Sequence, residues 1–222
     1  MSLVLGIDTC GPVGSVALAR LSPGALDLLG QIELPSRNYT ATLVSAVGEL
    51  LSQAQSNMSA LHAIAVTSGP GSFTGVRVGL AAVKGLAEPA QTPVVAVSRL
   101  AVLASVAGTA SAALDAHRHE LFLRIESPDA QPRELLAGAS ELDELTPIPS
   151  RIAVCDDAAL PLLAAAWPAA ELVRVAAPTA ADLLAFAAPL IRAGQFADLA
   201  LLDGHYLRRS DAEIFGSQPH CA

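Results

Sequence analysis

The sequence is poor in the features that mark several large classes of protein. Its three cysteines, Cys10, Cys155 and Cys221, are widely spaced and form no CxxC pair, which argues against a disulfide framework or a thiolate zinc site. Lys and Arg number 13 against 21 Asp and Glu, and the net charge of −8 offers no footprint for nucleic acid or anionic lipid. No apolar run approaches the roughly 20 residues of a membrane helix, and MSLVLGID lacks the basic region of a secretory signal. We therefore expect a soluble, cytoplasmic protein with no membrane partner.

Catalytic signatures are also missing. The sequence contains no GxSxG elbow, no HExxH and no recognisable acid pair for glycoside chemistry, which argues against a hydrolase. His117 and His119 alternate on a predicted strand or turn, as two metal ligands would. Because no carboxylate or cysteine stands at a known ligand spacing, exposed hairpin histidines are the favoured interpretation, and no metal site is expected.

What is present is an apolar chain. Of its 222 residues 52% are hydrophobic and 15% charged, enough for the core of one large domain or two small ones. Apolar runs between turn residues predict strands at 3–7, 15–19, 26–34, 61–67 and 93–97. Helical spacing predicts helices at 39–55 and 74–88, the second ending before Pro89. The order is βββαβα.

The second half of the chain repeats this order more weakly. ALDAHRHELFLRI resembles GIDTCGPVGSVAL, with Asp115 in the place of Asp8. Strands at 151–154 and 172–175 and helices at 156–166 and 179–193 continue the repeat. We therefore predict an α/β fold of two similar lobes with mixed sheets, residues 1–97 and 98–205, and a tail, 206–222, that packs back on the first lobe.

The stretch SGPGSFTGVRVGLAAVKGLA, residues 68–87, is the most informative part of the sequence. Gly69, Gly71 and Gly75 surround a strand-to-helix turn, so the helix amides are free to hold a phosphate, or the turn lets the helix pack closely. The pattern is neither a Walker A loop nor GxGxxG. Gly75, Gly79 and Ala82 share one helix face, which suits contact with another helix or with the chain's own sheet.

Asp8 ends the first predicted strand and is followed by Thr9, Cys10 and Gly11. A carboxylate in this position can orient a magnesium-bound water while the next backbone amides hold a phosphate. The alternative is an Asx-type turn that caps the strand.

Together, LVLGIDTCGPVGSVAL, LVSAVGELL and above all SGPGSFTGVRVGLAAVKGLA closely resemble the bacterial TsaB family, also called YeaZ. PVVAVSRLAVLA, ALDAHRHELF and YLRRSDAE extend the resemblance along the chain, although residues 129–195 match loosely. The family has the ASKHA fold of actin and DnaK-type chaperones, with two duplicated βββαβα lobes. One departure is SRNYTATL, where family members often carry a histidine.

The resemblance implies a non-catalytic accessory subunit that binds and supports the TsaD transferase when threonylcarbamoyladenosine is made on tRNA. The ATPase TsaE joins the assembly, tRNA is met only through the complex, and the chain pairs with itself when alone. TsaD carries two metal-binding histidines after a strand comparable to residues 93–97. The comparable positions here are Arg99 and Leu103, so that metal site cannot form.

The resemblance also implies site residues. Asp8, Thr9, Gly69 and Gly71 keep the outline of an ancestral nucleotide cleft, but no cofactor is required, and ATP or ADP remains an option at the partner interface. The predicted helices 39–55 and 74–88 would pack against the equivalent helices of TsaD. The interface residues, chosen as apolar or small on shared helix faces, are Leu43, Val47, Leu50, Val76, Gly79, Leu80 and Val83.

Two other classes of function stay open at this point. An ATP-dependent small-molecule kinase of the same fold would use Asp8 and the GPGSFTG loop. A metallopeptidase-like protein is the other alternative, a label that once followed the wider family.

Overall fold

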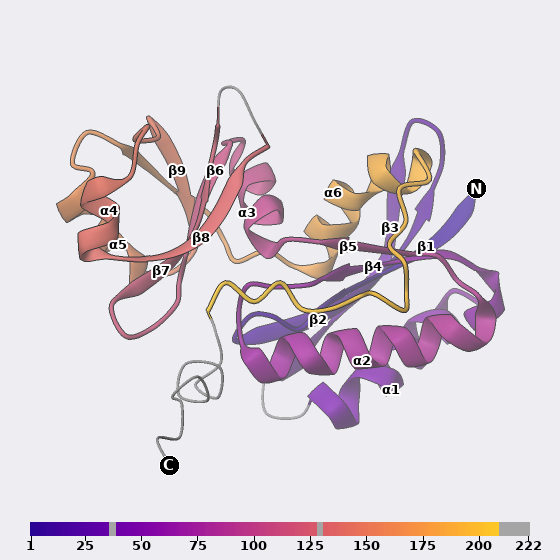
Figure 1. Ribbon diagram of the computed structural model, residues 1–222. Helices are drawn as coiled ribbons and strands as arrows, with labels where there is room; N and C mark the ends of the chain where they lie inside the picture. The colour runs from indigo at the N-terminus through magenta and orange to yellow at the C-terminus, as the bar shows by residue number, and fades with distance from the viewer. Residues whose placement is uncertain (36–38, 128–130, 209–222) are drawn as a thin grey trace, which may run out of the picture.

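The computed structural model describes residues 1–35, 39–127 and 131–208, and it contains two five-stranded mixed sheets (Figure 1). The first sheet has the order β3-β2-β1-β4-β5 and the second β10-β9-β6-β7-β8. In each sheet the first three strands along the chain form an antiparallel meander. Two further strands then add beside the first strand of the meander and run parallel to it. The strands of the first sheet are β1 (Ser2–Asp8), β2 (Val13–Leu21), β3 (Leu26–Pro35), β4 (Leu61–Thr67) and β5 (Val94–Val97). Those of the second are β6 (Ser111–Asp115), β7 (Glu120–Ile125), β8 (Arg133–Gly138), β9 (Arg151–Val154) and β10 (Glu171–Arg174).

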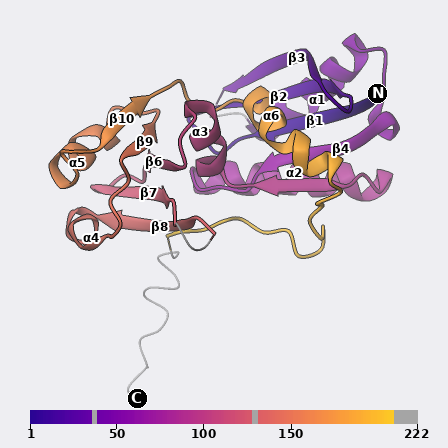
Figure 2. The same cartoon turned by 90° about the horizontal axis from the view of Figure 1, so that it is seen from above.

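Helices cover both faces of the first sheet, which explains why β1 and β4 are apolar along almost their whole length. On one face lie α1 (Tyr39–Gln53), the short 3-10 turn η2 (Met58–Ala60) and α2 (Phe73–Ala90). On the other lies α6 (Ala180–Arg192), which crosses β1, β2 and β4 (Figure 2). The sheet therefore separates two apolar layers, each closed by its own helices.

The second sheet is built in the same way on a smaller scale. Helix α3 (Arg99–Ala107) packs on one face, and α4 (Ala139–Glu144) and α5 (Ala159–Ala166) pack on the other. The Trp167 side chain lies inside the second of these layers, and its indole N–H donates to the Leu142 carbonyl oxygen at 3.1 Å. This bond satisfies a polar group that burial would otherwise leave unpaired.

Each half of the chain ends in a helix that packs on the other half's sheet. Helix α3 follows β5 but contacts β6, β7 and β9, while α6 follows β10 but contacts the first sheet. Gly6 permits the close approach of α6, because a Cβ there would lie 2.7 Å from the Ala180 carbonyl oxygen. The Ser15 hydroxyl accepts from the Ala180 amide at 2.8 Å, so a first-sheet side chain also binds the start of α6.

The duplicated α/β architecture confirms the predicted fold class. The expected lobe of residues 98–205 needs a correction, since α6 lies on the first sheet. Helices α3 and α4 were not anticipated, and α2 continues to Ala90, past Pro89. The segments 36–38 and 209–222, which hold part of SRNYTATL and most of the tail, lie outside the described residues. Within residues 1–35, 39–127 and 131–208, no helix is long and apolar enough to cross a membrane.

Candidate functional site

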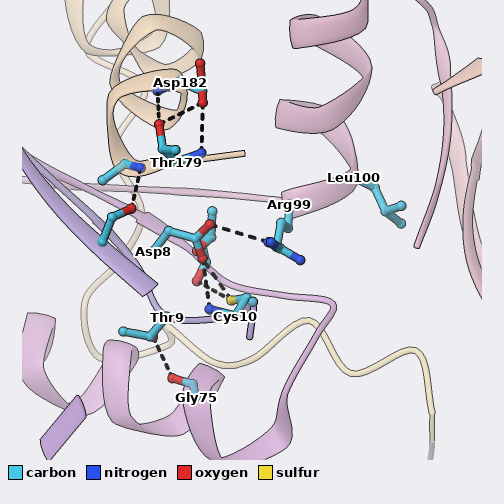
Figure 3. A network of polar contacts seen from close by, with 12 residues as sticks. Asp8, Thr9, Cys10, Gly75, Arg99, Leu100, Thr179 and Asp182 are labelled. Carbon is cyan, nitrogen blue, oxygen red and sulfur yellow. Dashed lines mark hydrogen bonds and ion pairs between the residues drawn. The ribbon is translucent and has the colours of Figure 1, made fainter. Parts of the chain in front are cut away.

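The candidate site lies where the two sheets meet, at the carboxyl ends of β1 and β4. Asp8 ends β1, Thr67 ends β4, and Arg99 opens α3. Hydrogen bonds bring these three side chains together although they come from distant parts of the chain. Figure 3 shows the Arg99 side chain pointing toward Asp8. In open α/β sheets the carboxyl ends of parallel strands are the usual place for a ligand site.

Both oxygens of the Asp8 carboxylate are engaged by the protein itself. Oδ1 accepts from the Cys10 amide at 2.8 Å and from the Thr67 hydroxyl at 2.7 Å. Oδ2 lies 3.4 Å from Nε of Arg99. The Asp8 and Arg99 side chains are only 1% and 5% exposed, so the pair is shielded from water. The contact with the Cys10 amide is the Asx-type turn that the sequence left as the alternative.

Burial and the Asp8 carboxylate control the ionisation of the neighbouring groups. Burial, reinforced by the Asp8 charge, raises the pKa of the Cys10 thiol to about 12. The same two causes raise the pKa of the Tyr39 hydroxyl, which donates to the Gly11 carbonyl oxygen at 2.8 Å. For Arg99 burial is the largest cause and lowers the pKa, but attraction to Asp8 together with smaller contributions from Cys10 and Cys155 makes the net shift upward. The site therefore holds a charged guanidinium and a protonated thiol beside the Asp8 side chain.

The glycines of the SGPGSFTG loop serve close packing. A Cβ at Gly71 would overlap the Cys10 carbonyl oxygen, and one at Gly75 the Thr9 carbonyl oxygen. The Thr9 hydroxyl donates to the Gly75 carbonyl oxygen at 2.6 Å and lies where a Gly79 side chain would be. These contacts confirm the tight-turn interpretation, in which the turn after β1 fills the space beside the start of α2.

The backbone and hydroxyl groups of Gly69 and Ser72 in this loop also form hydrogen bonds within the protein. Gly69 adopts a φ of +116°, a conformation that favours glycine, and its carbonyl oxygen accepts from the Arg99 amide at 2.7 Å. The Ser72 hydroxyl caps α2 by accepting from the Gly75 amide at 3.2 Å. The Ser72 amide donates to the Cys10 carbonyl oxygen at 2.9 Å.

These residues do not fit a magnesium nucleotide in this arrangement. The carboxylate that would orient a magnesium-bound water faces Arg99, and the glycine positions that would admit phosphates hold backbone atoms of Thr9 and Cys10. Arg99 Nη2 occupies the space that a Gly11 Cβ would need, so the guanidinium also closes the turn. Across residues 1–35, 39–127 and 131–208, no group of three or more His, Cys, Asp or Glu could hold a metal ion.

The side chains expected at a partner interface point into the first lobe instead. All seven are buried, and six of them share the apolar core between the first sheet and its helices, while Gly79 faces Thr9. The choice of residues was therefore wrong for a surface, because apolar helix faces pack on the chain's own sheet. The six core residues are Leu43, Val47, Leu50, Val76, Leu80 and Val83.

The second sheet carries a weaker copy of the Asp8 turn. Asp115 ends β6, and its Oδ1 accepts from the His117 amide at 2.8 Å, as Asp8 accepts from Cys10. His117 is 86% exposed and its Nδ1 lies 2.9 Å from Oδ2 of Asp115. His119 is exposed as well, so the interpretation of exposed hairpin histidines is confirmed.

Sequence reasoning did not anticipate the contact between Arg99 and Asp8. Arg99 was considered only as the replacement for a metal-binding histidine. The available signal was a single arginine at the head of the otherwise apolar segment RLAVLASVA, where a charge needs a buried partner. Thr67 was likewise missed, because a threonine at a strand end is common.

Comparison with known proteins gives concordant matches. The family model "TsaD: tRNA N6-adenosine threonylcarbamoyltransferase" matches residues 33–128. The tRNA threonylcarbamoyladenosine biosynthesis protein TsaB of Escherichia coli is 34% identical over 125 residues, which is 54% of this chain and 52% of that protein. The Bacillus subtilis protein of the same name is 32% identical over 123 residues, with 54% and 52% covered. The chain thus spans about half the length of the curated relatives it matches.

Solved structures extend the likeness over the whole fold. The structure "YeaZ from Pseudomonas aeruginosa" is 28% identical with a TM-score of 0.71, and the match covers 93% of this chain and 100% of that one. A second Pseudomonas aeruginosa structure, described as similar to peptidase YEAZ, is 29% identical with a TM-score of 0.73 and covers 94% and 100%. These neighbours and the TsaD-like region fit an ASKHA-type fold. Together the matches show that this chain is similar to TsaB, or YeaZ, proteins.

Proposed function

We propose that this chain is a non-catalytic accessory subunit in the threonylcarbamoyladenosine modification of tRNA, and that it binds and supports a TsaD-type transferase. The observation that carries the proposal is the likeness to TsaB relatives and, along almost the entire chain, to YeaZ. A TsaE-type ATPase joins the assembly, and tRNA, modified at the adenosine next to the anticodon, is contacted through the complex.

The residues at the Asp8 site support a non-catalytic role. Arg99 and Leu103 stand at the positions that the resemblance assigns to metal histidines in TsaD. Arg99 neutralises Asp8, and Leu103 is fully buried in the apolar layer between α3 and the second sheet. Both positions thus serve packing and charge balance, and we propose that this site needs no nucleotide. Calorimetry with Mg-ATP should show no binding heat, and a clear saturable signal would contradict this part of the proposal.

The outward face of α1 and α2 is the surface we assign to the partner. This face is what remains after the inward side chains have formed the core, and its exposed positions include the small residues Ala41, Ser45, Gly48, Ala81 and Gly85. Val44 is 56% exposed, and a Cβ added at Gly48 or Gly85 would meet nothing within 4 Å. Small residues let two helices approach closely, so a helix pair of a TsaD-type protein can lie against this one. In the absence of that partner, we expect two copies of this chain to pair through the same face.

The structure also selects the variant that tests this surface. A substitution at Gly79 would disrupt the contact with Thr9 inside the fold, whereas Gly85→Arg adds its side chain to open space on α2. Gly24→Arg, in the turn between β2 and β3, is the matched control because a Cβ there also meets nothing. Arginine also favours the helix over glycine by about 0.5–1 kcal/mol, so the Gly85 variant should fold.

We expect Gly85→Arg to weaken binding to a purified TsaD-type protein by about tenfold or more in titration calorimetry, since bulk and charge enter a close contact. Gly24→Arg should bind as the parent chain does. Equal affinities for the parent and a folded Gly85→Arg chain would refute the assignment of this face.

A further inference from the structure

The segment between α6 and residue 208 runs along the first lobe and then reaches the second (Figures 1 and 2). We call residues 197–208 the strap. Its first contact is a bridge to the edge strand β5, where the Ala197 amide donates to the Val94 carbonyl oxygen at 2.8 Å. Leu202 then inserts into the core of the first lobe.

The end of the strap touches both lobes at once. The His205 amide donates to the Ser68 carbonyl oxygen at 2.7 Å, in the loop between β4 and α2. The His205 side chain turns the other way, and its Nε2 lies 2.9 Å from Oε2 of Glu134 on β8. One residue thus joins the first lobe through its backbone and the second lobe through its ring.

The residues that follow His205 also contact both lobes. The Tyr206 ring lies 5.4 Å from the Phe73 ring at the start of α2, and its hydroxyl accepts from Nε of Arg77 at 3.4 Å. Leu207 packs against the apolar layer of α3, and Arg208 forms an ion pair with Glu120 on β7. The strap is therefore anchored on both sides of the junction by apolar, aromatic and charged contacts.

Glu134 is the strongest of these anchors because polar groups from three segments gather at its carboxylate. Ser98 Oγ lies 2.7 Å from its Oε2, Arg124 Nη1 lies 2.8 Å from its Oε1, and His205 completes the set. Ser98 also caps α3 and connects β5 to it, so this buried carboxylate joins the strap to the crossover between the lobes. Charge-assisted hydrogen bonds in a buried setting are stronger than exposed ones.

We propose that the strap fixes the orientation of the two lobes, so that the chain presents both to a partner as one rigid body. Two lobes joined only by connecting segments would be expected to move relative to each other. The buried pair of Asp8 and Arg99 forms a second tie across the same junction. The proposal concerns the chain alone, so its test does not depend on the proposed function.

The test measures the spread of distances between the lobes in the full chain by electron paramagnetic resonance. Spin labels are attached at Asp27→Cys on β3 and Asp143→Cys on α4, both exposed positions away from the outward face of α1 and α2, and labelled chain is diluted with unlabelled chain so that only distances within one chain are measured. Cys155 and Cys221 are replaced by serine, and Cys10 is left in place because it is buried. The parent should give one narrow distance distribution.

The double variant His205→Ala, Arg208→Ala removes two anchors to the second lobe. We expect a clearly broader distribution, while Leu201→Ala, at a strap position that is 79% exposed, leaves the narrow distribution unchanged. Ile152→Val, a core change in the second lobe, controls for reduced stability and should also leave it narrow. A folded double variant with the parent's distribution, or equal broadening in Ile152→Val, would overturn the proposal. If the double variant does not fold, Arg208→Ala alone is judged by the same two outcomes.

Discussion

Removing one partner of the buried pair of Asp8 and Arg99 should destabilise the folded chain by several kcal/mol, because the other charge would stay buried without compensation. Arg99→Met keeps much of the side-chain volume but removes the guanidinium that lies beside Oδ2 of Asp8. The carboxylate would then stay buried with its charge uncompensated, although Oδ1 would keep the Cys10 amide and the Thr67 hydroxyl. Removing one member of a buried pair typically costs about 3–5 kcal/mol.

For a chain of this length, about 3 kcal/mol corresponds to a fall of roughly 6–12 °C in the midpoint of thermal unfolding. Asp8→Asn in the Arg99→Met background removes the uncompensated charge, so the double variant should be more stable than Arg99→Met by about 1–2 kcal/mol. Urea unfolding of the four proteins of this cycle measures the coupling. A loss below about 1 kcal/mol in Arg99→Met, with no recovery in the double variant, would refute the account of this site.

Three further predictions concern other parts of the fold. Gly75→Ala should lower the free energy of unfolding by about 1–3 kcal/mol, because the added Cβ overlaps the Thr9 carbonyl oxygen. This cost should exceed the gain from alanine's higher helix propensity. A variant as stable as the parent in urea unfolding would contradict this contact. Burial raises the pKa of Glu134, but contacts with His205, Ser98 and Arg124 outweigh burial and lower the pKa below the ordinary 4.5. The stability contributed by Glu134 is therefore present above pH 4.5 and is lost as the pH falls toward the lowered pKa. In Glu134→Gln the free energy of unfolding should therefore fall less steeply with decreasing pH below 4.5. An unchanged pH dependence in this range would argue against the role of Glu134. With a pKa of about 12, the buried Cys10 thiol should resist a thiol reagent at pH 8 until urea is added, as peptide mass spectrometry would show, and rapid labelling of the native chain would disprove its burial.

Local patterns predicted much of the first lobe because they reflect its packing directly. The apolar run of β1, the turn residues after Asp8 and the helical spacing of α1 each specify an element with buried and exposed faces. The repeat in the second half was visible for the same reason, since Asp115 and its turn reproduce the hydrogen bond made by Asp8.

Contacts between distant segments were not predictable in this way. The sequence shows that α6 has an apolar face, but it does not say which sheet receives that face, and the answer depends on Gly6 and Ser15 in the other lobe. The apolar faces of α1 and α2 were assigned to a partner for a similar reason. A pattern that marks burial is the same whether the burial lies inside the chain or between chains.

For the Asp8 site, the sequence identified two of the segments that form it but not the residue that pairs with the carboxylate. The sequence placed the Asp8 carboxylate at the end of the first strand and the glycines at a separate strand-to-helix turn, and the two segments lie against each other in the fold. What spacing alone did not reveal is that the Arg99 guanidinium, 91 residues away along the chain, lies against that carboxylate. His205 received no role from the sequence, although it links the two lobes through Ser68 and Glu134.

The most direct test of the central claim is the modification of tRNA in a reconstituted mixture of the TsaD-type transferase, the TsaE-type ATPase, the adenylate-forming enzyme, ATP, threonine and bicarbonate. Formation of threonylcarbamoyladenosine is measured with this chain, without it, and with the Gly85→Arg and Gly24→Arg variants. An accessory subunit predicts that the chain alone is inactive, that the mixture needs it, and that Gly85→Arg fails where Gly24→Arg succeeds. Full modification in the absence of the chain, or by the chain alone, would contradict the account.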